Sequence, residues 1–176
     1  KEFSVPILYC TKSLFSRARI KANTLEPPAS HAILGDWYSM LVPTRNGNLV
    51  LYMSDKTLLT FIFTEGERLT VEKLFLCFLQ GLQNVLPALI NSLPRTQAII
   101  DEYSSGLICR AKNASLLGSL ADFAVTYAKF VDDDGGIGKA SIGDLVFEVN
   151  QRPCRRLGGL SPWEVTAQLL QRPQSN

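Results

Sequence analysis

The sequence predicts an α+β fold in a single domain, with an antiparallel sheet of about four to five strands packed with about five helices. Three observations favour this class. The length of 176 residues suits one domain. An Asn46-Gly47 pair separates two strand-like runs, and apolar residues recur at helical spacing further along the chain. Residues 1–176 should form this single domain, in which residues 1–4 are a processed or disordered start and residues 172–176 a tail.

The first segment pairs a strand with a helix. Residues 5–10 form a short apolar run, which is typical of a buried strand. Thr11 can then act as the N-cap of a helix from Lys12 to about Arg19. Residues 21–30 carry an Asn, two prolines and a Ser, so they are predicted to form a loop.

Three consecutive strands are predicted at residues 37–44, 48–54 and 57–64. The Asn-Gly pair between the first two strands is the strongest short hairpin signal. Ser54-Asp55-Lys56 provides a compact second turn. Because links this short join antiparallel neighbours, the three strands should form a meander.

The rest of the chain is mainly helical. Thr70 is a suitable N-cap for a helix that should end near Pro87. A helix from Pro94 to Tyr103 and a strand over residues 106–112 follow. The remaining predictions are a helix capped by Asn113 or Ser115 and ended by the acidic turn 132–136, a helix over 142–150, and a last helix that the capping box Ser161-Pro162-Trp163-Glu164 opens and that ends near Leu170.

Composition limits the environment and the cofactors. No run of ~18 apolar residues is present and the start lacks the apolar core of a signal peptide, so we expect a cytoplasmic protein with no membrane partner. The cysteines are far apart in the sequence, which favours free thiols over disulfides or a zinc site. They are Cys10, Cys77, Cys109 and Cys154.

The sequence contains no complete nucleophile, calcium or nucleotide motif, so the catalytic residues stay unassigned. The single histidine, His31, has no nucleophile motif beside it. The acidic turn 132–136 matches only the first part of a calcium loop, and we interpret it as a solvated helix end. Residues 136–141 lack the hydroxyl and the glycine spacing of a nucleotide loop. We therefore expect no metal and no cofactor.

One group of candidate binding residues lies near the ends of the predicted strands and in the helix that follows Asn113. Each has a structural explanation in turn geometry, turn charge or helix capping. If they converged at one end of the sheet, a carboxylate–lysine cluster could perform acid/base chemistry or bind an anion. The group comprises Asp36, Trp37, Lys56, Lys112, Asn113 and Asp122.

A second group lies between residues 150 and 164. Arg152, Arg155 and Arg156 fall within five positions, between a helix stop and a capped helix start. The net charge of +2 is smaller than a duplex-binding domain usually carries. Phosphate binding needs only local charge, however, so the three arginines form a candidate anion-binding edge.

Several motifs together resemble a prokaryotic family that is described as a domain of unknown function. The resemblance implies no reaction, and it covers nearly the whole chain. That family often has His after the Trp, where this chain has Tyr38. The motifs are Ile7-Leu8-Tyr9-Cys10-Thr11-Lys12, Leu34-Gly35-Asp36-Trp37-Tyr38, Ser54-Asp55-Lys56-Thr57-Leu58, Lys112-Asn113-Ala114-Ser115-Leu116-Leu117-Gly118-Ser119-Leu120-Ala121-Asp122 and Asn150-Gln151-Arg152-Pro153.

The segment 150–164 also resembles a pattern that follows the catalytic core of integrase-type transposases. Such an enzyme needs three metal-binding carboxylates on a sheet that contains parallel strands. The predicted meander is antiparallel, and Asp36, Asp55 and Glu148 lack the expected surroundings, so we interpret the match as convergent. The matching residues are Asn150, Arg152, Pro153, Leu157, Gly158, Pro162 and Glu164, with Cys154 in place of Arg and Ser161 in place of Thr.

Three functional hypotheses remain open. The first is a non-enzymatic binding or interaction module of a bacterium or mobile element, with a protein or nucleic-acid partner. If the partner is nucleic acid, the three arginines and Lys112 would contact phosphates. The second is a small enzyme with a polar site around Asp36, Lys56, Asn113 and Asp122. The third is a homodimer through the apolar meander 49–63.

Overall fold

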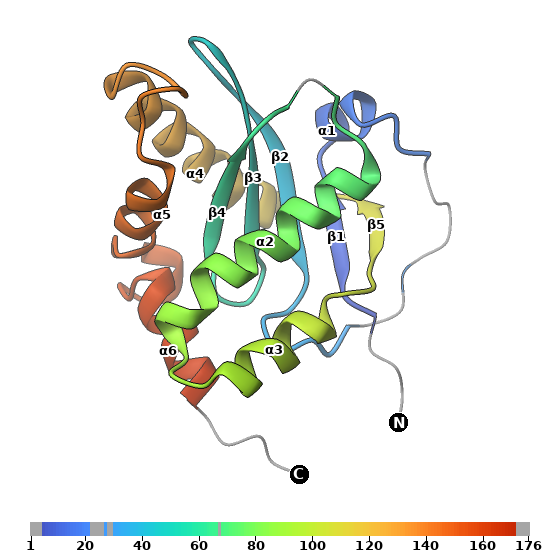
Figure 1. Ribbon diagram of the computed structural model, residues 1–176, viewed down its shortest axis with the longest axis vertical. Helices are drawn as coiled ribbons and strands as arrows, with labels where there is room; N and C mark the ends of the chain where they lie inside the picture. Colours follow the sequence, from blue (N-terminus) through green and yellow to red (C-terminus); the bar gives the residue numbers. More distant parts are fainter. Residues whose placement is uncertain (1–4, 22–26, 28–29, 67, 172–176) are drawn as a thin grey trace.

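A five-stranded mixed sheet forms the centre of the computed structural model, which describes residues 5–21, 27, 30–66 and 68–171 (Figure 1). The strand order is β4-β3-β2-β1-β5. The strands are β1 (Ile7–Cys10), β2 (Trp37–Thr44), β3 (Gly47–Ser54), β4 (Thr60–Thr64) and β5 (Leu107–Arg110). The helices are α1 (Lys12–Arg17), α2 (Val71–Leu89), α3 (Leu93–Glu102), α4 (Ala114–Asp133), α5 (Ile142–Asn150) and α6 (Pro162–Gln171), with a 3-10 turn η1 (Arg155–Leu157).

The sheet is only partly antiparallel. The predicted meander is confirmed, because β3 pairs antiparallel with both β2 and β4. The prediction of a wholly antiparallel sheet was wrong, since β1 lies parallel to β2 and to β5. Parallel neighbours require long connections that return the chain to the same end of the sheet. The connection from β1 to β2 contains α1, and the connection from β4 to β5 contains α2 and α3.

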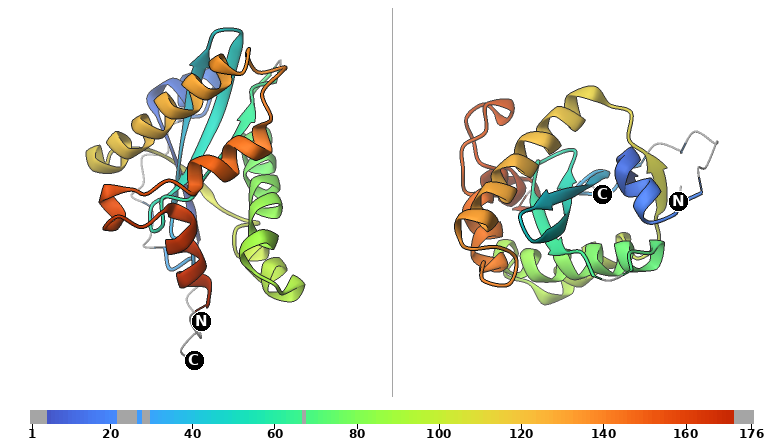
Figure 2. Two further views of the ribbon diagram at one scale, coloured as in Figure 1. Left: turned by 90° about the vertical axis from the view of Figure 1, so that its left-hand side faces the viewer. Right: turned by 90° about the horizontal axis from the view of Figure 1, so that it is seen from above.

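Helices cover both faces of the sheet. Figure 2 shows α2 on one side of the strands and α4 on the other, while α5 lies beside the edge strand β4. The described part of the chain contains six α-helices, where about five were expected. Both faces of β3 are therefore buried within one chain, from Leu49 to Ser54. A homodimer through the meander stays a prediction, and the residues from Leu49 to Ser54 are buried without a second copy.

An aromatic cluster fills the α2 side of the sheet. Trp37, Tyr52 and Phe61 lie on neighbouring strands and contact Phe78 of α2, with ring centroids 5.2–6.0 Å apart. Gly81 allows this close approach, because a Cβ there would lie 2.2 Å from the ring of Phe61. The cluster fixes α2 on the sheet through apolar burial, the main stabilising term in folding.

A buried amide joins α5 to the open edge of β4. Asn150 is 0% exposed. Its Oδ1 accepts from the Thr60 N–H (2.8 Å) and its Nδ2 donates to the Thr60 carbonyl (2.7 Å). The Thr60 hydroxyl also lies 2.8 Å from the Tyr127 hydroxyl of α4. The side chain of Asn150 thus takes the place of a neighbouring strand at this point and satisfies backbone groups that burial would otherwise leave unpaired.

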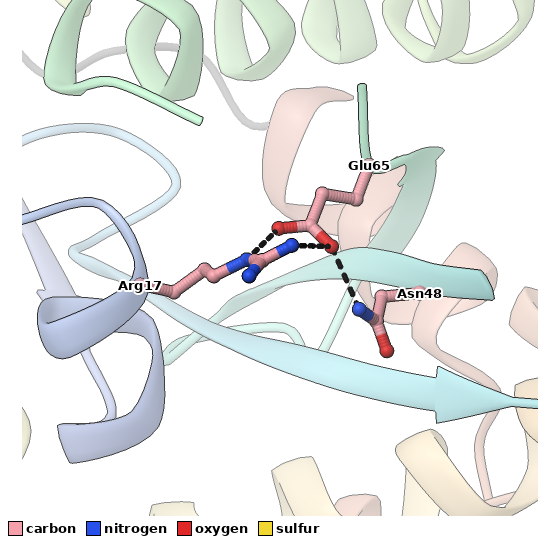
Figure 3. Close-up of polar contacts among 3 residues, drawn as sticks. All are labelled: Arg17, Asn48 and Glu65. Carbon is pink, nitrogen blue, oxygen red and sulfur yellow. Dashed lines mark hydrogen bonds and ion pairs between the residues drawn. The ribbon is translucent and has the colours of Figure 1, made fainter. Parts of the chain in front are cut away.

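An ion pair fastens α1 to the meander (Figure 3). The Arg17 Nε lies 2.5 Å from Oε1 of Glu65, whose Oε2 accepts from the Asn48 amide at 2.7 Å. The Glu65 side chain is only 5% exposed. Burial acts to raise the pKa of Glu65, but the hydrogen bonds from Arg17 and Asn48 outweigh it and hold the pKa below its ordinary value.

Most of the predicted helix starts are confirmed. Thr70 and Asn113 each accept a backbone N–H three residues on, and Ser161 and Glu164 form the reciprocal capping box. Thr11 occupies the N-cap position of α1, but its side chain makes no capping hydrogen bond.

Some predicted boundaries differ. α2 runs past Pro87 to Leu89, because Pro87 sits in the last turn and the Ile90 N–H still reaches the Leu86 carbonyl at 2.9 Å. The predicted loop 21–30 lies mostly outside the described residues.

Candidate functional site

A cleft of about 680 Å³ separates α4 from the connection between α5 and α6. This volume falls in the range of small-molecule binding sites in proteins, roughly 300–1,000 Å³. In the left view of Figure 2 the α5–α6 connection passes the start of α4, where Arg156 donates to the Ser115 carbonyl. The lining residues are Ser119, Asp122, Phe123 and Thr126 from α4, and Val149, Arg152, Pro153, Cys154, Arg155 and Arg156 from the other wall.

The α4 wall is one polar face of an amphipathic helix. Ser119, Asp122 and Thr126 follow one another at spacings of three and four, so they share a face. The buried face of α4, which includes Leu120 and Tyr127, packs on the sheet and holds the polar face outward. The carboxylate of Asp122 is exposed and makes no hydrogen bond or ion pair with any residue that the structure describes.

The opposite wall is a loop closed by its own backbone. The Cys154 N–H donates to the Leu160 carbonyl at 2.9 Å, and the Gly159 N–H donates to the Cys154 carbonyl at 3.1 Å. Gly158 and Gly159 have φ angles of 68° and 89°, which glycine adopts without the clash that a Cβ would cause. With Asn150 anchored before it and the Ser161 capping box after it, this loop presents its arginines from a rigid frame.

The three arginines have different surroundings. Arg152 forms an ion pair with Glu148 at 2.7 Å, and its guanidinium lies 4.4 Å from the centre of the Phe130 ring. Arg156 reaches across to α4, where its Nη1 donates to the Ser115 carbonyl (2.7 Å) and to the Ser119 hydroxyl (3.1 Å). Arg155 is exposed, and its side chain makes no hydrogen bond or ion pair with the described part of the chain.

The charges of the cleft favour an anion in one part of it. The charge of Arg152 is offset by Glu148. The remaining lining charges are the cations of Arg155 and Arg156 and the carboxylate of Asp122, two positive and one negative, for a net +1. Phosphate and carboxylate groups bind guanidinium through charge-assisted hydrogen bonds, so the arginine side of the cleft is suited to such groups.

Asp36 and Lys56 lie at a different place, the corner where β2 begins and β3 ends. The Asp36 carboxylate accepts from the Ile7 N–H at 2.9 Å, and the Lys56 ammonium donates to the Ala32 carbonyl at 2.7 Å. Trp37, a further candidate binding residue, is 1% exposed and belongs to the aromatic cluster. These contacts hold the corner of the sheet together.

Asp55, in the same corner, has the most perturbed carboxyl in this part of the molecule. Its Oδ1 is buried and has no hydrogen-bond partner among the described residues. Burial, followed by the charge of Asp36, raises the pKa of Asp55 to about 6, while Lys56 and nearby backbone N–H groups oppose the shift. The carboxyl packs directly on Gly35, where a Cβ would lie only 1.9 Å from Oδ1. The sequence predicts Asp55 in a turn and did not place it among the candidate binding residues.

Lys112 and Asn113 lie at the carboxyl end of β5, the end opposite to Asp36 in this parallel part of the sheet. Asn113 caps α4, with its Oδ1 3.1 Å from the Leu116 N–H, and Lys112 is exposed. Asp122 lines the cleft instead. The four residues proposed for an enzyme site, Asp36, Lys56, Asn113 and Asp122, therefore lie in three places and do not line one pocket.

The structure joins Asp122 to the arginines, which the sequence analysis had placed in separate groups. It also adds Ser119, Phe123 and Thr126, which that analysis did not select. A signal for them exists, because Ser115, Ser119, Asp122 and Thr126 repeat at helical spacing beside the apolar stripe of α4. Only the fold shows that these polar residues face the arginine loop.

The cysteines are free thiols, as predicted. None of the four forms a disulfide. Burial raises the pKa of Cys10, Cys77 and Cys109, which keeps these side chains protonated at neutral pH. Within the described residues, no three His, Cys, Asp or Glu side chains group together as a metal site, and no helix there is long and apolar enough to span a membrane.

The fold and the cleft define an α+β protein with a surface site lined by arginine, hydroxyl and carboxylate groups. The chain belongs to the family described as Domain of unknown function (DUF6933), which matches residues 7–165. No curated protein and no solved structure matches it.

Proposed function

We propose that this protein is a binding module that holds an anionic, phosphate-bearing ligand in the cleft between α4 and the α5–α6 connection. The observation that carries the proposal is Arg155, an exposed guanidinium that lines a 680 Å³ cleft and makes no polar contact with the described residues. Its five N–H donors are available to a ligand in a planar fork that matches phosphate and carboxylate oxygens.

Rigidity of the arginine loop supports the proposal. Arg156 is already held against Ser115 and Ser119, and these contacts use its Nη1 alone. The loop itself is closed between Cys154 and Leu160. A ligand would therefore meet one guanidinium, that of Arg156, already held in place, and a closed loop backbone beneath Arg155, which lowers the entropy cost of association.

The distribution of charge favours a small ligand over a nucleic-acid duplex. Arg152 lies over Phe130 and Arg156 lies against Ser115, so they contact opposite ends of α4, roughly 20 Å apart along the helix axis. Arg152 is paired with Glu148 and adds little net charge. The positive charges of the cleft that no ion pair among the described residues offsets are those of Arg155 and Arg156, which suits a compact anionic group.

Isothermal titration calorimetry with sodium phosphate and pyrophosphate tests the proposal. Arg155→Ala should weaken binding by about tenfold or more, because a hydrogen bond to a charged group contributes roughly 1.5–3 kcal/mol. The matched control is Arg110→Ala, which removes an exposed arginine on β5 and should leave binding unchanged. Binding should also weaken as salt rises. Equal affinity of Arg155→Ala and the parent protein, or the lack of binding by the parent at millimolar anion, would refute the proposal.

A further inference from the structure

We infer that the ligand of this cleft is a nucleoside phosphate, with its phosphate on Arg155 and Arg156, its sugar hydroxyls on Asp122 and its base against Phe123. The inference rests on the anion-binding function proposed above and specifies the chemical class of the ligand.

Asp122 is the first reason. A carboxylate can only accept hydrogen bonds, and it repels phosphate oxygens. Asp122 nevertheless lines the same cleft as the arginines, and none of the described residues satisfies it. Sulfate has no hydrogen-bond donor at neutral pH, and the few P–O–H donors of inorganic phosphate sit on an anion that Asp122 repels. A ligand that carries hydroxyl or amino donors beside its phosphate satisfies both sides of the cleft.

The spacing along α4 is the second reason. The Arg156 guanidinium lies on Ser119, at 3.1 Å from the hydroxyl. Asp122 follows three residues later, which is a rise of roughly 4.5 Å along the helix. The cationic and acceptor parts of the cleft are thus about one helical turn apart. A sugar that bears its phosphate on one carbon and hydroxyls on others spans a separation of this kind, and carboxylates bind ribose hydroxyls in dinucleotide-binding folds.

Phe123 and the size of the cleft are the third reason. Phe123 is next to Asp122, is partly exposed and lines the cleft. An aromatic side chain beside a phosphate site provides a flat apolar surface on which a base can stack. The volume of 680 Å³ exceeds what a phosphate ion needs and accommodates a mononucleotide. The aromatic surface favours a nucleoside phosphate over a plain sugar phosphate.

Calorimetry with four probes tests the assignment: sodium phosphate, ribose 5-phosphate, adenosine 5′-monophosphate and guanosine 5′-monophosphate. At least one nucleotide should bind about tenfold or more tightly than phosphate. Asp122→Asn should weaken nucleotide binding by a similar factor, while phosphate binding stays the same or strengthens because a repulsive charge is lost. Phe123→Leu should weaken the nucleotide but not ribose 5-phosphate. Asp134→Asn, an exposed carboxylate at the end of the same helix, is the matched control.

The outcomes separate this inference from the proposed function. If phosphate binds through Arg155 but no nucleotide binds more tightly, the inference is overturned and the anion-binding function stands. If no probe binds, both fall. Nucleotide binding that is unchanged in Asp122→Asn overturns the placement of the sugar. A single-stranded oligonucleotide that binds more tightly than any mononucleotide, with affinity rising with its length, overturns the small-ligand assignment in favour of nucleic acid.

Discussion

Replacing Asp55 with Asn should stabilise the protein at neutral pH. The Oδ1 of Asp55 is buried without a hydrogen-bond partner, and Asp36 places a second negative charge nearby. In the folded protein the pKa of Asp55 is about 6, raised from an ordinary 3.8. The folded state therefore binds this proton more tightly than the unfolded chain does. Asn keeps the size and shape of the neutral carboxyl and removes the charge.

The sign and the size of the effect follow from that shift. The protonated carboxyl stabilises the fold below about pH 3.8, and this stabilisation is lost as pH rises through about 6. A shift from 3.8 to about 6 corresponds to roughly 3 kcal/mol as an upper limit. Because the carboxyl is partly exposed, solvent screening reduces the expected gain to about 1 kcal/mol. In a protein of this size, that gain raises Tm by about 2–4 °C.

Urea unfolding of both proteins, followed by circular dichroism at about pH 7.5 and about pH 4, measures the effect. The stability difference should be largest at the higher pH and should nearly vanish at the lower one, where the folded parent already carries a neutral Asp55. Asp134→Asn, which changes an exposed carboxyl in the same way, serves as the control. A destabilised variant at about pH 7.5, or an equal gain at both pH values, would refute the reasoning.

Two further predictions concern the frame that holds the arginine loop. Asn150→Ala should lower the free energy of unfolding by about 3 kcal/mol, because it leaves the buried N–H and carbonyl of Thr60 without their partners. Chemical denaturation measures this, and a loss below about 1 kcal/mol would show that water or a neighbour replaces the amide. Gly158→Ala should cost about 1 kcal/mol, because its φ of 68° is unfavourable for any residue with a Cβ. Gly138→Ala, where the backbone has no such φ and a Cβ meets nothing within 4 Å, is the control and should be neutral in the same chemical denaturation.

Local signals predicted much of the fold correctly. The Asn46-Gly47 turn and the Ser54-Asp55-Lys56 turn each join strands that pair over short loops, so the meander could be inferred from neighbouring residues. The caps Thr70, Asn113 and Ser161 act within three residues of their partners. Such features depend on a few adjacent residues, which is why a pattern in the chain is enough to identify them.

Parallel pairing could not be predicted in the same way. β1 lies between β2 and β5, and β5 is separated from β1 by almost a hundred residues of chain. No turn motif records a pairing over that distance, since register and direction depend on how the intervening helices pack. The short runs of β1 and β5 therefore indicate strands but not the direction of their neighbours.

The candidate site shows the same division. The proximity of Arg152, Arg155 and Arg156 is a property of the chain, and their selection as an anion-binding edge needed no structure. Their different contacts could not be foreseen, because Glu148 and Phe130 hold one arginine while Ser115 and Ser119 hold another. In the segment that resembles a transposase, Asn150 makes a buried contact with distant Thr60, while the left-handed glycines and the capping box are local features.

By itself, the sequence determined the α+β class, the meander, most of the helix starts and the cluster of arginines, because each depends on side chains within about one turn of one another. Tertiary structure decided that α4 turns Asp122 toward the arginine loop and that Asp36 and Lys56 belong to a corner of the sheet instead. It also decided that Asp55 carries a raised pKa. These outcomes depend on which surfaces pack together and exclude water, and burial of that kind is a property of the assembled fold.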